Sequence, residues 1–269
     1  MTPGGVRARL ARERARDLLS PIVHRSARVA GARSRRATAF AGGLAIFLGF
    51  ALLADAVATV VWEEPITAVF AQERQKALEK KLTAIENAPV DATTLKLVKN
   101  AITKEKRMAL LAEDLRRRSR SGDPIGRISI PRLDKKFVFV GGTGLESLKK
   151  GPGHYDTTWL PGQKGTVGIA GHRTTYLAPF RQLDRMRKRD RIVLTMPYGR
   201  FTYRVESMQV VSPSRVTVLR SVGHERLVLT TCTPPHSAAR RLIVMARLDS
   251  SRALGPTIPQ TALPPHAPL

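Results

Sequence analysis

The single cysteine of the chain, Cys232, is the residue whose type and position most directly suggest chemistry. It ends the alternating run Leu227 to Thr231 and stands shortly before two consecutive prolines, which force the chain to turn. The end of a strand is rigid enough to aim a side chain and open enough to admit a substrate. Because the thiolate is the reactive form, a nucleophilic Cys232 needs a base or a cation close to it. The alternative, a small buried apolar side chain, needs neither.

Histidine and arginine residues at two other predicted strand ends could supply that base and that cation. His172 directly follows the apolar run 166–171, and an imidazole at this position can exchange a proton with a thiol near neutral pH. Arg240 and Arg241 begin the last predicted strand, which would return antiparallel beside the strand of Cys232. Since side chains alternate across a strand, one of the two guanidinium groups faces the cysteine and could hold a developing oxyanion.

Other interpretations of these residues stay open on the sequence alone. His172 could be a structural histidine, and the two arginines could be solvated strand residues. A zinc site built from Cys232, His236 and His172 is a further alternative, although the paired Cys or His spacing of structural zinc sites is lacking. No acidic cluster typical of a calcium site stands out, so we expect no metal and no cofactor.

The segment that must position these residues, 122–249, is predicted to be an all-β domain, a mainly antiparallel barrel or sandwich. Short β-type runs alternate with turn residues over 127–130, 137–140, 166–170, 191–196, 201–211, 226–232 and 242–248. Two short helices fit near 144–150 and 178–188. Many short strands with few helices over about 120 residues are typical of one all-β domain. One cysteine forms no internal disulfide, so the domain must fold without one.

The N-terminal part predicts a single membrane anchor. Residues 39–62 are apolar except for Asp55, and as a helix they would span a hydrocarbon core of about 30 Å. The preceding arm, 1–38, is rich in arginine, and the positive-inside rule places it in the cytoplasm and the β domain outside the cell. A cleaved signal peptide, with a cleavage site at 56–58, is the alternative. The net charge of +25 could also attract nucleic acid, but no nucleic-acid module is visible, so we expect no such partner.

Two further segments flank the β domain. Residues 63–121 are rich in Ala, Lys, Glu, Leu and Arg and have partial apolar spacing typical of helices. This pattern predicts a solvated helical stalk between anchor and domain, with a coiled-coil partner site as the alternative. Residues 250–269 contain many prolines and no periodicity, which predicts a disordered tail.

Several separated motifs resemble the sortase family, and most closely its class E. They are GPGHY (151–155), IAGHRTTY (169–176), TMPYGRFTYRV (195–205) and LTTC (229–232) followed by RRLIV (240–244). The resemblance covers about residues 125–248 and implies an eight-stranded β-barrel with cysteine transpeptidase activity. It assigns the catalytic roles to Cys232, His172 and Arg241, with Arg240 pointing the other way. It further implies that Thr230, Thr231 and Tyr176 line the substrate groove.

The resemblance also implies a reaction and its partners. Cys232 would attack the Thr–Gly bond of an LAXTG- or LPXTG-type sorting signal on a secreted protein, and an amine of the peptidoglycan precursor would resolve the thioacyl enzyme. Two positions depart from the family pattern, Leu177 in place of a glycine and the run 233–238, and both bear on which substrate side chains are accepted. A pilin-polymerising sortase and a non-catalytic, membrane-tethered binding module are the alternatives.

Overall fold

The computed structural model describes residues 40–55 and 65–254. Residues 40–55 form a helix inside the segment expected to be the membrane anchor. The rest of that segment, the basic arm 1–38 and the candidate cleavage site at 56–58 lie outside the described residues. Within the two described ranges, no helix is both long and apolar enough to cross a membrane. The membrane anchor therefore stays a prediction.

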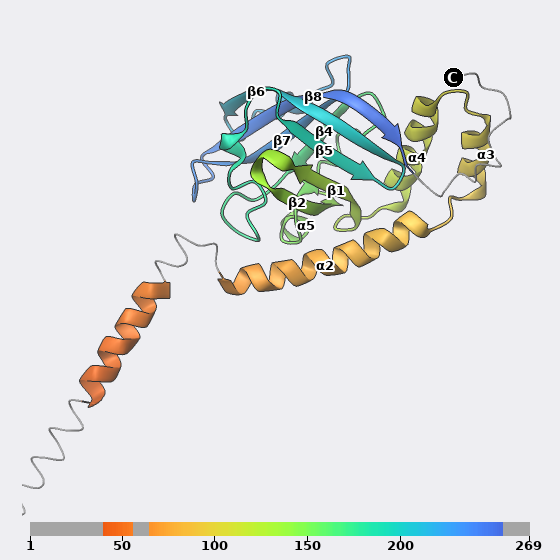
Figure 1. Cartoon of the computed structure of the whole chain (residues 1–269). Coiled ribbons are helices and arrows are strands. Elements are labelled where there is room, and N and C mark those ends of the chain that lie inside the picture. The colour runs from red at the N-terminus through yellow and green to blue at the C-terminus, as the bar shows by residue number, and fades with distance from the viewer. Residues whose placement is uncertain (1–39, 56–64, 255–269) are drawn as a thin grey trace, which may run out of the picture. The chain divides into compact units, whose positions relative to one another are not determined.

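An eight-stranded barrel occupies residues 124–253 (Figure 1). Its strands are β1 (Pro124–Ile130), β2 (Lys135–Gly141), β3 (Gly153–His154), β4 (Thr166–Ala170), β5 (Arg191–Met196), β6 (Gly199–Val211), β7 (Arg226–Thr233) and β8 (Arg240–Ala253). They close in the order β1-β2-β3-β4-β7-β8-β6-β5, and only the pairs β2–β3 and β4–β7 are parallel. The predicted all-β, eight-stranded barrel is confirmed. The strand pattern missed β3 because two residues cannot show an alternation.

The inside of the barrel holds alternate side chains of its strands. Along β6, Phe201, Tyr203 and Val205 are buried while the residues between them are not. They share one buried cluster with side chains of the other long strands, among them Leu194 and Val244. Burying a side chain of this size stabilises the fold by about 1.5–3 kcal/mol relative to leaving it exposed. The barrel interior is therefore the main source of stability.

Four short helices lie between the strands: η1 (Pro131–Leu133), α5 (Leu145–Leu148), η2 (Leu183–Arg185) and η3 (Val216–Leu219).

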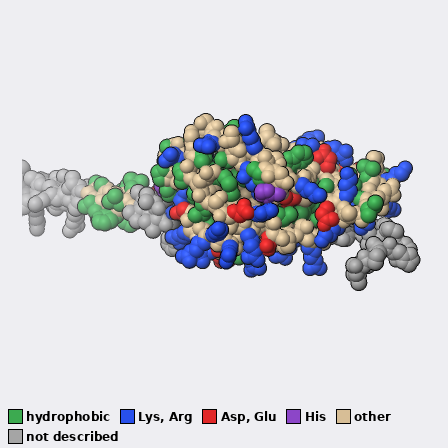
Figure 2. Space-filling model, turned by 90° about the horizontal axis from the view of Figure 1, so that it is seen from above, with side chains coloured by type: hydrophobic (Ala, Val, Ile, Leu, Met, Phe, Trp, Pro, Cys, Tyr) green, Lys and Arg blue, Asp and Glu red, His purple; other side chains and the backbone are tan. Residues whose placement is uncertain are grey.

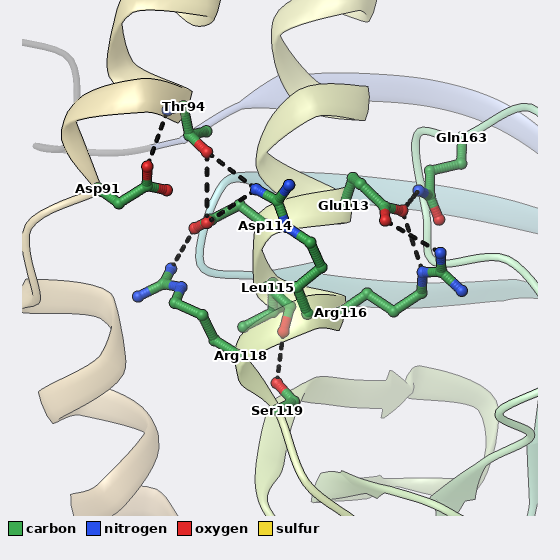
Figure 3. Close-up of polar contacts among 10 residues, drawn as sticks. Asp91, Thr94, Glu113, Asp114, Leu115, Arg116, Arg118, Ser119 and Gln163 are labelled. Atoms are coloured by element: carbon green, nitrogen blue, oxygen red, sulfur yellow. Dashed lines mark hydrogen bonds and ion pairs between the residues drawn. The ribbon is translucent and has the colours of Figure 1, made fainter.

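The segment expected to be a solvated stalk is helical, but its last two helices, α3 (Ala92–Asn100) and α4 (Lys104–Arg118), pack on the barrel. Met108, Leu111 and Leu115 of α4 belong to the same buried cluster as the barrel interior. Polar contacts join α3 to α4 (Figure 3): the Thr94 hydroxyl donates to the buried Asp114 at 3.4 Å and accepts from Arg117 Nη2 at 3.2 Å. Within α4, Asp114 also pairs with Arg118 at 2.7 Å. Burial raises the pKa of Asp114.

The first helix of this segment, α2 (Pro65–Asn87), packs along β1 and β2 (Figure 1). Leu78 and Leu82 contact Val138 and Val140 of β2. The short β3 leaves the backbone of Val138 unpaired, and the Gln75 carboxamide satisfies it by donating to Val138 O at 3.1 Å and accepting from Val138 N at 2.8 Å. The interpretation as a solvated stalk is therefore wrong: α2, α3 and α4 belong to the same compact unit as the barrel.

We expect Leu82→Ala to lower the free energy of unfolding of the full chain by about 2–5 kcal/mol. Leu82 is fully buried at the contact between α2 and β2, so its truncation leaves a cavity. Chemical denaturation in a neutral detergent measures the change. The control is Lys80→Ala, an exposed site two residues away, which should change the unfolding free energy by less than about 0.5 kcal/mol. Equal stabilities of the two variants would show that α2 does not pack on β2.

Strand β8 runs past the expected end of the domain at residue 249. Residues 250–253 pair with residues 199–202 of β6. These four residues were expected in the disordered tail because their side chains show no apolar alternation. Pairing here rests on backbone hydrogen bonds, which need no apolar side chains. It is possible because β6 is 13 residues long and offers partners along this part of β8. Residues 255–269 lie outside the described part of the chain.

Candidate active site

Three neighbouring strands, β4, β7 and β8, bring the three predicted catalytic residues, the catalytic row, to one end of the barrel. In the antiparallel register of β7 and β8, Cys232 is paired with Arg241. On the other side of β7, the parallel register pairs Ala170 of β4 with Thr230. Strand β4 ends at Ala170, and His172 lies two residues beyond it, in a loop that the Gly171 N–H ties to Thr230 O at 3.0 Å. Cys232 thus has Arg241 on its β8 side and the start of the His172 loop on its β4 side.

The end of β7 is fixed by the two threonines that precede Cys232. Thr231 donates its hydroxyl to Gly171 O at 2.8 Å, and the hydroxyls of Thr230 and Tyr155 are 2.8 Å apart. Both threonines are buried, whereas Cys232 is partly exposed. Their hydroxyl groups thus hold β7 to its neighbours. Whether the two threonines also line a substrate groove stays a prediction.

His172 has the features of a proton-transfer group. Burial lowers its pKa below the ordinary value of 6.5, so the imidazole is neutral at physiological pH. Its Nε2 atom is buried and has no hydrogen-bond partner among the described residues. Leaving such an atom unpaired costs about 1–3 kcal/mol, so a water, the thiol or a bound substrate is expected to form a hydrogen bond with it. The Tyr176 ring lies 5.1 Å from the imidazole and forms one wall beside it.

Arg241 keeps donors free for a ligand. Its Nη1 donates to Ala238 O at 2.9 Å and to Arg240 O at 3.2 Å, which leaves three of the five guanidinium donors. In the described ranges it forms no ion pair. The neighbouring Arg240 is exposed and is paired with Thr233, so it lies on the opposite side of β8. The register thus gives Arg241, not Arg240, the position beside Cys232.

The loop after His172 is strained. Tyr176, Leu177 and Ala178 have φ angles of 51°, 67° and 40°, in the left-handed region that side chains other than glycine rarely adopt. Leu177 stands where the family pattern has glycine, and this backbone conformation explains the preference for glycine there. Such strain, of order 1–3 kcal/mol per residue, is typical of functional loops.

A close backbone approach beneath this loop requires Gly171. A Cβ atom at this position would lie 2.6 Å from the Phe180 ring. Phe180 N donates to His172 O at 3.1 Å, which closes the loop back on the histidine. The fully buried Phe180 therefore supports His172 from the barrel side.

Arg173 is a candidate positioning residue that the sequence reasoning missed. It is 5% exposed, and no other arginine or lysine among the described residues is buried. Its Nη1 donates to Thr233 Oγ1 at 3.1 Å and to Cys232 O at 3.4 Å. Its Nε donates to Arg181 O at 3.2 Å, and Nη2 pairs with Asp184 at 3.0 Å. The guanidinium thus ties the loop after His172 to the end of β7. In the sequence, its position directly after Gly171 and His172 was the one indication of a role near the site.

We expect Arg173→Met to lower kcat at least tenfold, because the hydrogen bonds that hold the loop after His172 against the end of β7 are lost. The free energy of unfolding should fall by about 1.5–3 kcal/mol, because the same hydrogen bonds stabilise the fold. Arg173→Lys should restore part of kcat. The control is Arg226→Met at the other end of β7, where Nη2 likewise donates to two carbonyls, at 2.8 and 2.9 Å. Peptide turnover and thermal unfolding measure both variants. Equal losses of kcat in both would mean that Arg173 contributes only to stability.

The zinc alternative finds no ligand set. Over residues 40–55 and 65–254, no three His, Cys, Asp or Glu side chains lie close enough together to hold a metal ion. His236, its third proposed ligand, is exposed in the turn after Cys232. The constellation fits acyl transfer to a thiol instead: a partly exposed cysteine, a neutral imidazole and a guanidinium with free donors.

Comparison with known proteins agrees with this chemistry. The sortase domain family matches residues 128–249. Sortase D of Bacillus subtilis is 33% identical over 116 residues, which are 42% of this chain and 57% of that protein. Sortase SrtE1 of Streptomyces coelicolor is 33% identical over 147 residues, 49% of this chain and 42% of that protein. The chain thus spans about half the length of these curated relatives.

A solved structure, sortase E from Streptomyces avermitilis, is 36% identical with a TM-score of 0.46, and the match covers 52% of this chain and 99% of that one. The match to SrtE1 supports the resemblance to class E, and the match to sortase D shows that the similarity extends to another sortase. The match to the family over the segment that holds Cys232, His172 and Arg241 identifies residues 128–249 as a sortase domain.

Proposed function

We propose that the chain is a cysteine transpeptidase that joins secreted proteins to the cell wall. The observation that carries this proposal is the register that pairs Cys232 with Arg241 and pairs Ala170, two residues before His172, with Thr230, two residues before Cys232. The match to the sortase domain family supports it. The absence of a hydrogen-bond partner for His172 Nε2 in the described part of the chain adds support, because this nitrogen is available to the thiol and to the leaving group.

The first half of the reaction forms a thioacyl enzyme. Neutral His172 takes the proton of the Cys232 thiol, and the thiolate attacks the threonine carbonyl of the sorting signal. The free donors of Arg241 stabilise the oxyanion that develops. When the C–N bond breaks, His172 returns its proton to the glycine amine, which leaves. The acyl group is then bound to Cys232 as a thioester.

The second half transfers the acyl group to a new amine. An amine of the peptidoglycan precursor attacks the thioester carbonyl, and His172 accepts its proton. Arg241 again holds the oxyanion, and the Cys232 thiolate leaves and regains its proton. The product is an amide bond between the secreted protein and the precursor. Each step uses one imidazole alternately as base and acid.

The substrates and the location belong to the same proposal. Similarity to a class E sortase favours an LAXTG-type signal at the C-terminus of the secreted partner over an LPXTG-type signal. Residues 39–62 would anchor the chain in the cell membrane as a single span, with the arginine-rich N-terminus in the cytoplasm and the barrel outside.

The test is to incubate the full chain in a neutral detergent with LAXTG and LPXTG peptides, first without and then with a glycine amine. Mass spectrometry should detect the acyl group on Cys232 and, after amine addition, peptide joined to glycine. Cys232→Ala is the control that should form no adduct. If a folded chain forms no adduct with either peptide, the transpeptidase proposal is contradicted in favour of a binding module.

A further inference from the structure

We propose that the cavity between α2 and α5 is a binding site for a phosphate group, carried by a membrane lipid or by a soluble compound. The cavity has a volume of about 320 Å³. Its lining from α2 is Arg74, Ala77, Leu78 and Lys81, and from the α5 side Glu146, Lys149 and Lys150, with Gly122 between them. None of these residues belongs to the catalytic row.

The lining carries four cations and one carboxylate. Glu146 is exposed and accepts from Lys149 at 2.7 Å, and Lys81 pairs at 2.7 Å with Asp123, which lies outside the lining. These two pairs leave Arg74 and Lys150 with no ion pair among the described residues. They come from different elements and line the same cavity, so two cations there lack a counter-ion.

The hydrogen bonds of Arg74 and Lys150 are also incomplete. The half-buried Lys150 ammonium donates to Gly122 O at 3.2 Å, and Arg74 Nη1 makes a long contact of 3.5 Å to Lys149 O. An ammonium has three donors and a guanidinium has five. Arg74 is exposed, so the cost of lost hydration falls on the half-buried Lys150, whose remaining donors lose free energy unless they find acceptors. A phosphate group offers several charged oxygens in a volume that this cavity admits, and both cation types bind it.

The carboxyl group of Glu146, which lines the cavity, lies in a positive electrostatic field. The hydrogen bond from Lys149 lowers the pKa of Glu146, and the charges of Arg74 and Lys150 lower it further. Figure 2 shows the face on the side away from α2, and there too Lys and Arg side chains cover more of the surface than Asp and Glu. The net charge of +25 attracts anions to the molecule as a whole.

A lipid phosphate lies within reach of this site if residues 39–62 anchor the chain as proposed. Helix α2 begins at Pro65, three residues after that segment, and Arg74 lies about 14 Å further along the helix at about 1.5 Å per residue. A headgroup phosphate is thus one source of the ligand. A soluble phosphate compound is the other, and it needs no membrane.

The first experiment titrates pyrophosphate into the full chain in a neutral detergent and follows the thermal unfolding temperature. We expect a saturable rise of a few degrees. The rise should disappear in the double variant Arg74→Gln with Lys150→Gln. It should persist in the control Arg187→Gln with Lys188→Gln, two exposed basic residues outside the cavity.

The second experiment compares hydrogen exchange of residues 72–82 and 145–150 in nanodiscs of phosphatidylcholine, with and without phosphatidylglycerol. Slower exchange in the anionic discs, lost in the double variant, supports a lipid phosphate. A pyrophosphate effect without this protection supports a soluble phosphate compound. No effect in either experiment, or effects that survive in the double variant, overturns the proposal. Neither readout uses peptide turnover, so this failure is distinguishable from failure of the transpeptidase proposal.

Discussion

His172→Gln is expected to lower kcat by about 10²–10⁴-fold while the barrel stays folded. Glutamine is polar and similar in size, but it cannot take the thiol proton or return a proton to the leaving amine. Glutamine keeps a polar group at this half-buried position, so we expect the free energy of unfolding to change by less than about 1 kcal/mol. Steady-state turnover of the sorting peptide and thermal unfolding measure the two effects.

The control for this variant is His224→Gln, which replaces a half-buried histidine that precedes β7 at the end opposite Cys232. Turnover by this variant should equal that of the wild type. A His172→Gln enzyme that retains more than a tenth of kcat would contradict the assignment of His172 as acid and base. Loss of folding would instead show that the imidazole is structural.

The lowered pKa of His172 also sets the sign of two pH effects. Since its base form is needed and its pKa lies below 6.5, kcat/KM should fall only on acidification below that value. Stability should fall in the same direction, because below pH 6.5 the unfolded chain binds a proton that the folded chain resists. The His172→Gln variant should lack this contribution to the pH dependence of stability.

Arg241→Ala is expected to lower kcat by about 10²–10³-fold with a smaller effect on KM, because its free donors act on the oxyanion rather than on the bound peptide. The matched control is Arg240→Ala, one residue away on the other side of β8, which should stay within about twofold of the wild type. Peptide kinetics on both variants measure the contrast. Equal losses in the two variants would show that a general basic charge, rather than the position opposite Cys232, matters.

The sequence was sufficient to predict that the ends of β4, β7 and β8 lie together, because each candidate residue of the catalytic row follows or begins an apolar run; their catalytic roles stay a prediction. Alternation identified β4 and β7, and the antiparallel return of β8 placed an arginine beside the cysteine. The register then distinguished Arg241 from Arg240, which alternation alone could not do. Such local patterns are visible in a single sequence because a strand imposes its period of two on its own residues.

Contacts between distant segments could not be predicted in this way. The partners of Arg173 lie 8 to 60 residues away in sequence, so its anchoring role appears only in the folded chain. Residues 63–121 show only partial apolar spacing, yet Met108, Leu111 and Leu115 of α4 complete the core. Burial of such a short stripe depends on the surface that it meets, and the sequence of the helix does not contain that surface.

The contact between Gln75 and Val138 has a consequence for how the barrel stays soluble. One carboxamide occupies the N–H and C=O groups that β2 would otherwise present to another chain, so α2 protects this edge against strand addition. A fragment that begins at residue 122, although it contains all eight strands, would expose this edge and the apolar patch beneath Leu78 and Leu82. We expect that fragment to aggregate edge to edge. Helix α2 thus protects the barrel against self-association.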